Sequence, residues 1–348
     1  MEATNQSSMH IEERISLKKY STFHIGGLAE FFTTAFSKEE LREAILWARE
    51  RGVVWRVIGE GSNILFSDSM VLGLTIRNVV RGIEEEVGAT DIRITVGAGE
   101  TWDALVVYTC EKGWWGLENL SRIPGTVGAT PIQNVGAYGV EVADSIESVL
   151  VYDTDEDVFV ALSKEECHFG YRHSLFREKE GMKYVVCSVV FVVPKESGPQ
   201  CAYRDLALYF KDTKKELLTP RMVRDAVSEI RSKKFPDWNV YGTAGSFFKN
   251  PIIDAVLFET IKKDYPELSG YTMSDGRIKV PLGWILDHVC HLRGVQEGLV
   301  GTYEAQALVI VAQEGATAEN ILAFTQKIAE CVKEKTNISI EHEVTHIK

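Results

Sequence analysis

The spacing of hydrophobic and polar residues predicts that strands and helices alternate through the first hundred residues. Apolar residues recur with helical spacing over 37–52, where Ser37 and Glu40 form a capping box. A strand-like run at 53–58 breaks at a glycine turn, and a second helix is predicted over 102–112. This alternation is typical of a mixed α/β fold.

Both periodicities continue along the rest of the chain. The longest apolar stretch, residues 184–193, is about half as long as a membrane span and is therefore expected to be a buried strand. Residues 194–200 are expected to be a surface connection. Further strands are predicted at 92–96, 145–152, 157–162, 307–312 and 337–341, with a helix beginning at Thr219-Pro220 and another over about 318–335.

Residues 114–141 are rich in glycine and proline yet apolar and aromatic, unlike a disordered linker, so a structured loop is predicted. Its glycines allow close backbone contacts, and Gln133 and Asn134 could donate to a heteroaromatic ring. The G-x-G turn at 59–61 could approach a phosphate but lacks the third glycine of the Rossmann fingerprint. The two segments fit a dinucleotide cofactor outside that class. Tight turns and a glycine-rich crossover remain the structural alternatives.

The balance of charge excludes one class of partner. Lys and Arg number 38 and Asp and Glu number 50, so the formal net charge is −12. A nucleic-acid-binding protein normally carries a basic face, so no nucleic acid is expected. An anionic substrate would need the cations of the chain to be concentrated locally. The length of 348 residues predicts two or three domains, at roughly 150 residues each.

Cysteine and histidine usage predicts neither disulfides nor a metal site. The six cysteines are scattered without a C-x-x-C pair, which favours reduced thiols in a cytosolic protein, and the first ten residues do not resemble a signal peptide. His288, Cys290 and His291 are close in sequence, and His342 and His346 are four apart. No established metal-binding pattern accompanies either group.

Two further segments place a polar residue among apolar ones. Arg172 lies between aromatic residues, and its planar guanidinium suits a carboxylate or a phosphate, although such an arginine is more often a surface or cation–π residue. Ser246 lies among small residues and two phenylalanines without the G-x-S-x-G elbow of a hydrolase nucleophile. In isolation, Ser246 is more often structural.

Taken together, seven segments resemble the MurB family of UDP-N-acetylenolpyruvoylglucosamine reductases. The resemblance extends from about Tyr20 to Val344, nearly the whole chain. This sequence has His342 where the family usually has proline, and Tyr303 where it usually has histidine. The segments, in family order, are YSTFHIGG, VIGEGSNILF, GAGETW, GLENLSRIPGTVGATPIQNVGAYGVE, FGYRHSLF, AGSFFKNP and the late EHEV.

The resemblance implies an FAD-binding fold of the vanillyl-alcohol-oxidase (PCMH) type. Two α/β subdomains, residues 1–75 and 76–200, would bind FAD, and a C-terminal α/β domain, residues 201–348, would bind substrate, with the last strand (338–348) able to return to the FAD domain. No histidine occupies the glycine loop, so the flavin is expected to be noncovalent. The implied FAD-binding residues are Gly59, Gly61, Ser62, Asn63, Pro124, Gly125, Gln133, Asn134, Gly136 and Ala137.

The resemblance also implies the chemistry and its residues. NADPH would reduce FAD, and hydride would then pass to the enolpyruvyl group of UDP-N-acetylglucosamine enolpyruvate. Arg172 and Glu343 match family residues that stabilise the enolate-like species, and Ser246 matches the donor of a proton to C2. A glutamate beside an anion is useful only if it is protonated or hydrogen-bonded. The implied substrate-binding residues are Tyr138, Tyr171, Tyr203, Lys234, Asn250 and Gln306.

The sequence is thus expected to encode a bacterial cytoplasmic reductase that makes UDP-N-acetylmuramate for peptidoglycan synthesis. A monomer that binds neither nucleic acid nor membrane is expected. One alternative is another FAD oxidoreductase of the same fold, which the segments AGSFFKNP and EHEV disfavour. The other is a noncatalytic UDP-sugar-binding protein, which the presence of Arg172, Ser246 and Glu343 disfavours.

Overall fold

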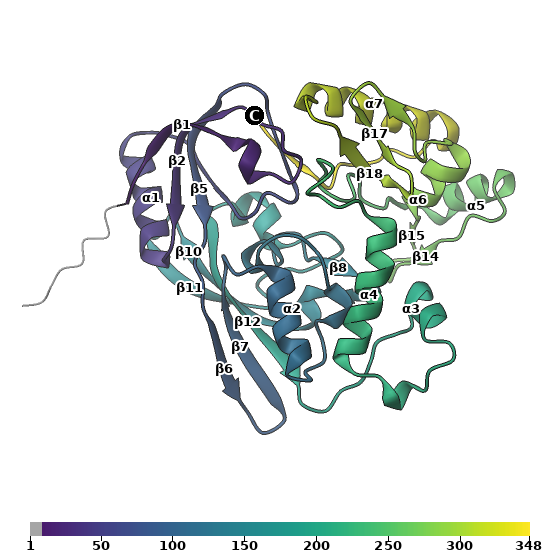
Figure 1. Cartoon of the computed structure of the whole chain (residues 1–348), viewed down its shortest axis with the longest axis horizontal. Helices are drawn as coiled ribbons and strands as arrows, with labels where there is room; N and C mark the ends of the chain where they lie inside the picture. The colour runs from purple at the N-terminus through teal and green to yellow at the C-terminus, as the bar shows by residue number, and fades with distance from the viewer. Residues whose placement is uncertain (1–8) are drawn as a thin grey trace, which may run out of the picture. The chain divides into compact units, whose positions relative to one another are not determined.

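Residues 9–348 are described here from a computed structural model, in which the chain divides into two compact units (Figure 1). The first unit holds residues 9–15, 29–60 and 72–231, and the second holds 16–28, 61–71 and 232–348. In the described part of the chain, no helix is long and apolar enough to cross a membrane.

A four-stranded sheet opens the first unit, in the order β1-β2-β5-β3. Helix α1 (Lys38–Glu50) packs on it through Leu41, Ile45 and neighbouring apolar residues, as the sequence pattern predicts. Ser37 caps the helix by accepting from the amide of Glu40. The strands are β1 (Glu12–Ser16), β2 (Leu28–Ala35), β3 (Trp55–Ile58) and β5 (Val71–Asn78), with β3 and β5 parallel.

A five-stranded antiparallel sheet, in the order β11-β10-β12-β7-β6, forms the rest of the framework of this unit. Tyr152, Val185 and Cys187 from its strands share a buried core with α1, β2 and β5. The strands are β6 (Ile83–Val87), β7 (Asp91–Gly97), β10 (Ile146–Asp153), β11 (Val158–Ser163) and β12 (Tyr184–Pro194). The predicted strands at 92–96, 145–152, 157–162 and 184–193 are therefore confirmed.

The glycine-rich loop, residues 114–141, is ordered by 3₁₀ turns and by the short pair β8 (Gly136–Ala137) and β9 (Val140–Glu141). It follows α2 (Trp102–Glu111), which packs on the five-stranded sheet through Trp102. This confirms the predicted structured loop. Further along the chain, α3 (Arg204–Tyr209) and α4 (Pro220–Lys234) bury apolar residues against Trp115 and Tyr138 of the loop.

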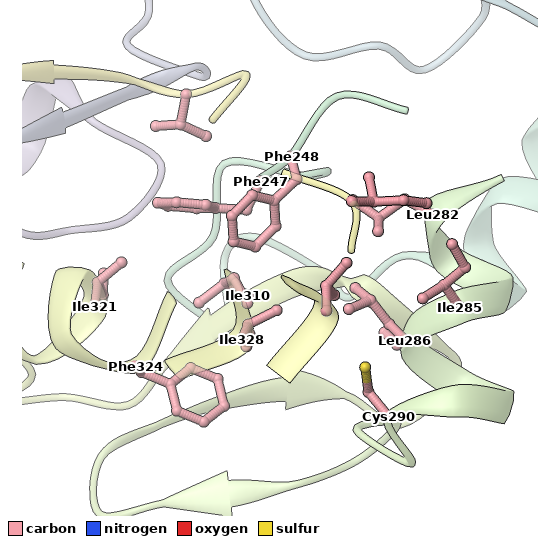
Figure 2. Packing of buried hydrophobic residues seen from close by; sticks show 14 of the residues in the cluster. Phe247, Phe248, Leu282, Ile285, Leu286, Cys290, Ile310, Ile321, Phe324 and Ile328 are labelled. Atoms are coloured by element: carbon pink, nitrogen blue, oxygen red, sulfur yellow. The ribbon is translucent and has the colours of Figure 1, made fainter. Parts of the chain in front are cut away.

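The second unit is built around one apolar core (Figure 2). Phe247 and Phe248 are each 1% exposed and pack with residues from α6, α7 and β18. Its helices are α5 (Ala255–Asp264), α6 (Leu282–Trp284), which continues as a π-helical turn, and α7 (Ala318–Thr336). Its strands are β4 (Ile64–Phe66), β13 (Ile252–Ile253), β14 (Tyr271–Thr272), β15 (Ile278–Lys279), β16 (Gln296–Glu297), β17 (Val300–Tyr303), β18 (Gln306–Ala312) and β19 (Thr345–Ile347).

At the start of α1, the Glu40 amide donates to the Ser37 hydroxyl, as the predicted capping box requires, and the Glu40 carboxylate accepts from the amide of Phe36. One sequence prediction is corrected. The strand predicted over 337–341 is absent: Asn337 ends α7 with a φ of 58°, and the chain then runs without strand pairing to an isolated bridge at His342. The alternating isoleucines there reflect burial of Ile338 in the core, not a sheet register.

Candidate active site

The two glycine segments identified in the sequence meet in the first unit. A Cβ added to Gly59 would lie 2.4 Å from Oγ1 of Thr126, in the glycine loop, so the close approach requires glycine. The loop is fixed there because the amide of Trp102 donates to the Gly125 carbonyl (2.9 Å) and Gly128 donates to Ala98 (2.8 Å). The loop thus presents a defined backbone surface beside the turn at residue 59.

Arg172 contacts the same loop further along. Its Nη2 donates to the carbonyl of Gly136 at 2.9 Å, and the guanidinium lies 5.7 Å from the ring centre of Tyr171. The amide of Asn134 ties the two segments together, because Nδ2 donates to Gly170 (3.0 Å) and to Glu141 (2.7 Å). Asn134 is 1% exposed, so this amide is part of the internal frame that holds Arg172 against the loop.

Three of the predicted site residues adopt a left-handed backbone conformation. The φ angles are 47° at Asn134, 49° at Tyr138 and 52° at Arg172. Residues other than glycine rarely adopt this conformation, and such strained positions concentrate at functional sites. Their occurrence together on one loop and its neighbouring turn supports a binding function for this part of the first unit.

Tyr138 is held from two sides. Its ring meets that of Tyr203 edge-on, with centroids 5.4 Å apart, and its hydroxyl is hydrogen-bonded by Arg231 of α4. Burial raises the pKa of Tyr138 to about 12, so the phenol stays protonated at neutral pH. Tyr203 is 40% exposed, whereas Tyr138 is 8% exposed.

Ser246 lies in the second unit, on a segment fixed by backbone pairing. It forms an isolated bridge with Val309 of β18, and the next amide, that of Phe247, donates to the Leu308 carbonyl at 2.9 Å. The side chains of Phe247 and Phe248 then enter the core (Figure 2), which leaves Ser246 half-buried beside it. The serine hydroxyl is thus carried by a rigid backbone with apolar neighbours.

Glu343 is hydrogen-bonded to that same segment. Its amide donates to the carbonyl of Phe247 at 2.8 Å, so Ser246 and Glu343 belong to paired segments of one unit. Glu343 is 8% exposed. Its neighbour His342 packs edge-on against the rings of Phe247 and Phe248, with centroids 4.8 and 5.2 Å away. Burial lowers the pKa of His342, and the charge of the nearby His346 lowers it further. Both effects favour the neutral ring.

Asn250 and Gln306 converge on the start of α6. Oδ1 of Asn250 accepts from the amide of Leu282 at 2.9 Å, which leaves its NH₂ group directed away from that bond. A Cβ added to Gly283 would lie 2.9 Å from Oε1 of Gln306. Two predicted substrate-binding amides therefore share one short helix of the second unit. Lys249, beside Asn250, pairs with Glu341 at 3.2 Å.

The predicted site residues divide between the two units. Those in the first unit are Gly59, Pro124, Gly125, Gln133, Asn134, Gly136, Ala137, Tyr138, Tyr171, Arg172 and Tyr203, and those in the second are Gly61, Ser62, Asn63, Lys234, Ser246, Asn250, Gln306 and Glu343. Within the first unit, Gly136, Tyr138, Tyr171 and Arg172 lie on the glycine loop and the turn attached to it. Within the second, Ser246 and Glu343 are paired, and Asn63 bonds to Glu343.

Four of the cysteines are buried thiols with raised pKa values. All six are free thiols. Burial raises the pKa of Cys110, Cys167, Cys187 and Cys290 to about 12, so these thiols remain protonated at neutral pH. This agrees with the expectation of reduced cysteines.

Comparison with known proteins decides the family. The chain is 38% identical over 336 residues to UDP-N-acetylenolpyruvoylglucosamine reductase of Ralstonia nicotianae, covering 96% of this chain and 98% of that protein. It is 40% identical over 323 residues to the enzyme of the same name from Neisseria gonorrhoeae, covering 91% and 92%.

The chain belongs to the UDP-N-acetylenolpyruvoylglucosamine reductase (MurB) family. Residues 29–161 match the FAD binding domain family, and residues 237–347 match the C-terminal domain of UDP-N-acetylenolpyruvoylglucosamine reductase. The crystal structure of MurB from Thermus caldophilus superposes with a TM-score of 0.67 at 25% identity, covering 98% of this chain and all of that one. The resemblance read from the sequence, and the α/β fold it implies, are confirmed.

Arg231, which hydrogen-bonds to the predicted site residue Tyr138, was not among the residues predicted from the sequence. The residue follows the apolar stripe of α4 and carries no motif, so nothing in the sequence marks it. Burial lowers its pKa, and the hydroxyl of Tyr138 is among the groups that partly offset this effect. Only the tertiary structure shows that Arg231 faces Tyr138, so no pattern in the sequence could have identified it.

The residues of the first unit fit an FAD group. Gly59 and Gly125 present bare backbone beside Thr126, and Gly125 has a φ of 121° that side chains rarely allow. Such glycine-rich backbone can approach a pyrophosphate closely, while Gln133 supplies an amide suited to the flavin ring. The donor set therefore matches the chemistry of a flavin dinucleotide.

Proposed function

We propose that the chain catalyses the NADPH-dependent reduction of UDP-N-acetylglucosamine enolpyruvate to UDP-N-acetylmuramate. The observation that carries this proposal is the hydrogen bond from Glu343 to Phe247, which places the proposed acid Ser246 and the proposed carboxyl group on paired segments. Bound FAD would supply the hydride, accepted from NADPH, that adds to C3 of the enolpyruvyl group. The chain itself must bind the substrate and manage charge and protons.

Ser246 is proposed to give its hydroxyl proton to C2 of the substrate. An alcohol is a weak acid, but the carbon that develops negative charge after hydride addition is basic enough to accept a proton from an aligned donor. The bridge to Val309 and the burial of Phe247 fix the backbone at Ser246. A fixed backbone limits the loss of alignment that would slow such a transfer.

Arg172 is proposed to bind the carboxylate of the enolpyruvyl group, on which the developing charge is delocalised. Its planar guanidinium can donate two parallel hydrogen bonds to a carboxylate, and the bond to Gly136 holds it in place. Glu343 is proposed to assist by hydrogen bonding to the same enolate-like species. Because Glu343 is 8% exposed, water contributes little to that interaction.

The remaining contacts are proposed by type of group. Gly59, Gly61, Ser62 and Asn63 would bind the FAD pyrophosphate, and the loop residues Pro124, Gly125, Gln133, Asn134, Gly136 and Ala137 would also bind FAD. Tyr138, Tyr171, Tyr203, Lys234, Asn250 and Gln306 would bind the UDP-sugar. Lys234 and Lys249 would supply local positive charge for a diphosphate in a chain of net charge −12.

We further propose the setting of the reaction. The product is a precursor of peptidoglycan, so the enzyme would work in a bacterial cytoplasm, as a monomer, and support cell shape and division. Residues 1–75 and 76–200 are proposed as the FAD-binding subdomains and 201–348 as the substrate domain.

The proposal is tested by separating the two half-reactions. Anaerobic reduction by NADPH should bleach the flavin, and adding the enolpyruvyl UDP-sugar should restore its colour. Ser246→Ala should leave the bleaching rate unchanged and slow the return of colour at least ~10²-fold, as for loss of a general acid. The matched control is Ser69→Ala, an exposed serine of the same unit. Equal slowing of both half-reactions by Ser246→Ala, or no return of colour in the wild type, contradicts the proposal.

A further inference from the structure

Residues 341–347 run between two other segments of the second unit and are hydrogen-bonded to both. On one side, Lys249 donates to the carbonyl of Glu341 (3.0 Å) and Glu343 donates to Phe247 (2.8 Å). On the other side, β19 pairs in parallel with β4, with Thr345 opposite Ile64. Glu343 thus lies at the point where the chain passes from one partner segment to the other.

Asn63 is hydrogen-bonded to two residues of this segment, Glu343 and Thr345. Its side-chain Nδ2 donates to the carbonyl of Glu343 at 3.1 Å, and its own carbonyl accepts from the amide of Thr345 at 3.0 Å. These two bonds join residues that are 280 or more positions apart in the sequence. Asn63 directly precedes β4, so its backbone is fixed by the same strand pairing.

The two peptide planes that flank the Cα atom of Glu343 are therefore both fixed. The plane before it is held by the bond from the Glu343 amide to Phe247. The plane after it is held by the bond from Asn63 to the Glu343 carbonyl at 3.1 Å and by a longer bond, 3.5 Å, from the Val344 amide to the Phe247 carbonyl. Fixing both planes fixes φ and ψ, and with them the direction in which the Glu343 side chain leaves the backbone.

We propose that Asn63 is a positioning residue for Glu343, acting through its side-chain amide on the Glu343 carbonyl. This inference rests on the proposed function only for its kinetic consequence. Its structural part stands on the two hydrogen bonds and the parallel pairing. Since Asn63 also belongs to the turn proposed to bind the FAD pyrophosphate, the cofactor turn and the segment of Glu343 form one hydrogen-bonded frame.

The first experiment measures the frame without catalysis. Hydrogen exchange of the Glu343 and Thr345 amides is compared in FAD-saturated wild type, Asn63→Ala and Asn63→Asp. Asn63→Asp keeps the size of the side chain but replaces the NH₂ donor by an acceptor. Both variants should speed exchange at these amides about fivefold or more. Unchanged exchange in both variants overturns the proposal.

The matched control is Asn78→Ala. Like Asn63, Asn78 is an asparagine whose Nδ2 donates to a distant carbonyl, that of Val186 at 3.0 Å, but it is buried where Asn63 is half-buried, and it belongs to the first unit. Its replacement should leave exchange at Glu343 and Thr345 within about twofold of wild type. Equal acceleration by Asn78→Ala means that any lost amide loosens the segment, and this overturns the specific role of Asn63.

The second experiment measures the kinetic consequence. With FAD saturating, Asn63→Ala should slow reoxidation by the enolpyruvyl UDP-sugar about tenfold more than it slows flavin reduction by NADPH. In a Glu343→Gln background the same change should slow reoxidation less than about twofold further, because the two residues act as one. Equal slowing in both backgrounds, or a variant that only raises the Kd for FAD, overturns the proposal.

The failure of the proposed function gives a different result. If Glu343→Gln alone does not slow reoxidation, the role proposed for Glu343 in the reaction is wrong. The exchange rates at Glu343 and Thr345 then still decide whether Asn63 holds the segment. The Kd for FAD, measured by quenching of flavin fluorescence, separates loss of cofactor from loss of positioning.

Discussion

Gly283 offers a change with opposite expected effects on stability and on substrate binding. It lies in α6, where its missing side chain leaves room for Gln306, whose Oε1 would be 2.9 Å from an added Cβ. The amide of Gln306 is the end of a flexible side chain, so Gly283→Ala should displace it rather than disrupt the backbone. The next nearest atom is Cδ1 of Leu308, at 3.3 Å, which can adjust by a few tenths of an ångström.

The magnitudes follow from these contacts. Alanine is favoured over glycine in a helix by about 0.5–1 kcal/mol, so the free energy of unfolding should rise slightly or stay unchanged. Displacing Gln306 should remove one neutral hydrogen bond to the nucleotide, worth about 0.5–1.5 kcal/mol. At 1.4 kcal/mol per tenfold, KM for the UDP-sugar should rise about 2- to 12-fold. The value of kcat should stay unchanged, as for loss of uniform binding.

Steady-state kinetics with the enolpyruvyl UDP-sugar and unfolding in urea measure the two effects. The control is a double-mutant cycle, because Gly283→Ala should not raise KM further in a Gln306→Ala background. A fall in kcat at unchanged KM, or an additive effect in that background, refutes the inference that Gly283 acts by making room for Gln306.

Three further changes test the frame around the site. Gly61→Ala should lower the free energy of unfolding by about 2–4 kcal/mol, because the added Cβ would lie 1.9 Å from a backbone carbonyl oxygen. Gly52 has a similar φ but no atom near the added Cβ, so Gly52→Ala should cost only about 1 kcal/mol. Equal losses in urea unfolding contradict the role given to this close contact. Arg231→Met should cost about 1–3 kcal/mol, and less in a Tyr138→Phe background, by the same assay. The pKa of His342 is lower in the folded protein than in the unfolded chain, so stability is lost as the pH falls below the pKa of the unfolded chain. Wild type should therefore lose more unfolding free energy than His342→Gln between pH 7.5 and about 5.5. An equal loss in the two proteins contradicts the lowered pKa of His342.

Local sequence signals predicted the elements that carry a clear cap, a helical period or a long apolar run. Helix α1 was predictable because Ser37 caps it and its apolar residues recur every three or four positions. Strand β12 was predictable because its apolar run is the longest in the chain and is buried in the centre of the five-stranded sheet. Helix α5 was missed because only Phe258 and Ile261 are buried on it, and the prolines and polar residues that surround it obscure its period.

The false strand at 337–341 shows the limit of periodicity as a signal. Its isoleucines alternate with polar residues as in a half-buried strand, yet Ile338 is buried beneath α7 without a ladder partner. Alternation reports that every second side chain is buried, and it does not report what covers it. The true strand, β19, is too short for an alternating pattern and depends on β4, about 280 residues earlier.

The site itself was predictable only through resemblance, and its bonding explains why. Glu343, Asn63 and Phe247, the residue after Ser246, are hydrogen-bonded in a frame assembled from three distant segments, and none of these bonds leaves a periodic trace in the sequence. The segments do show unusual composition, since glycines lie where backbone must approach backbone. Those glycines mark positions where two segments pack closely, but the candidate catalytic residues can be identified only when both segments are known. A glycine-rich motif of this kind therefore predicts the backbone packing of a site more reliably than the chemical role of any residue in it.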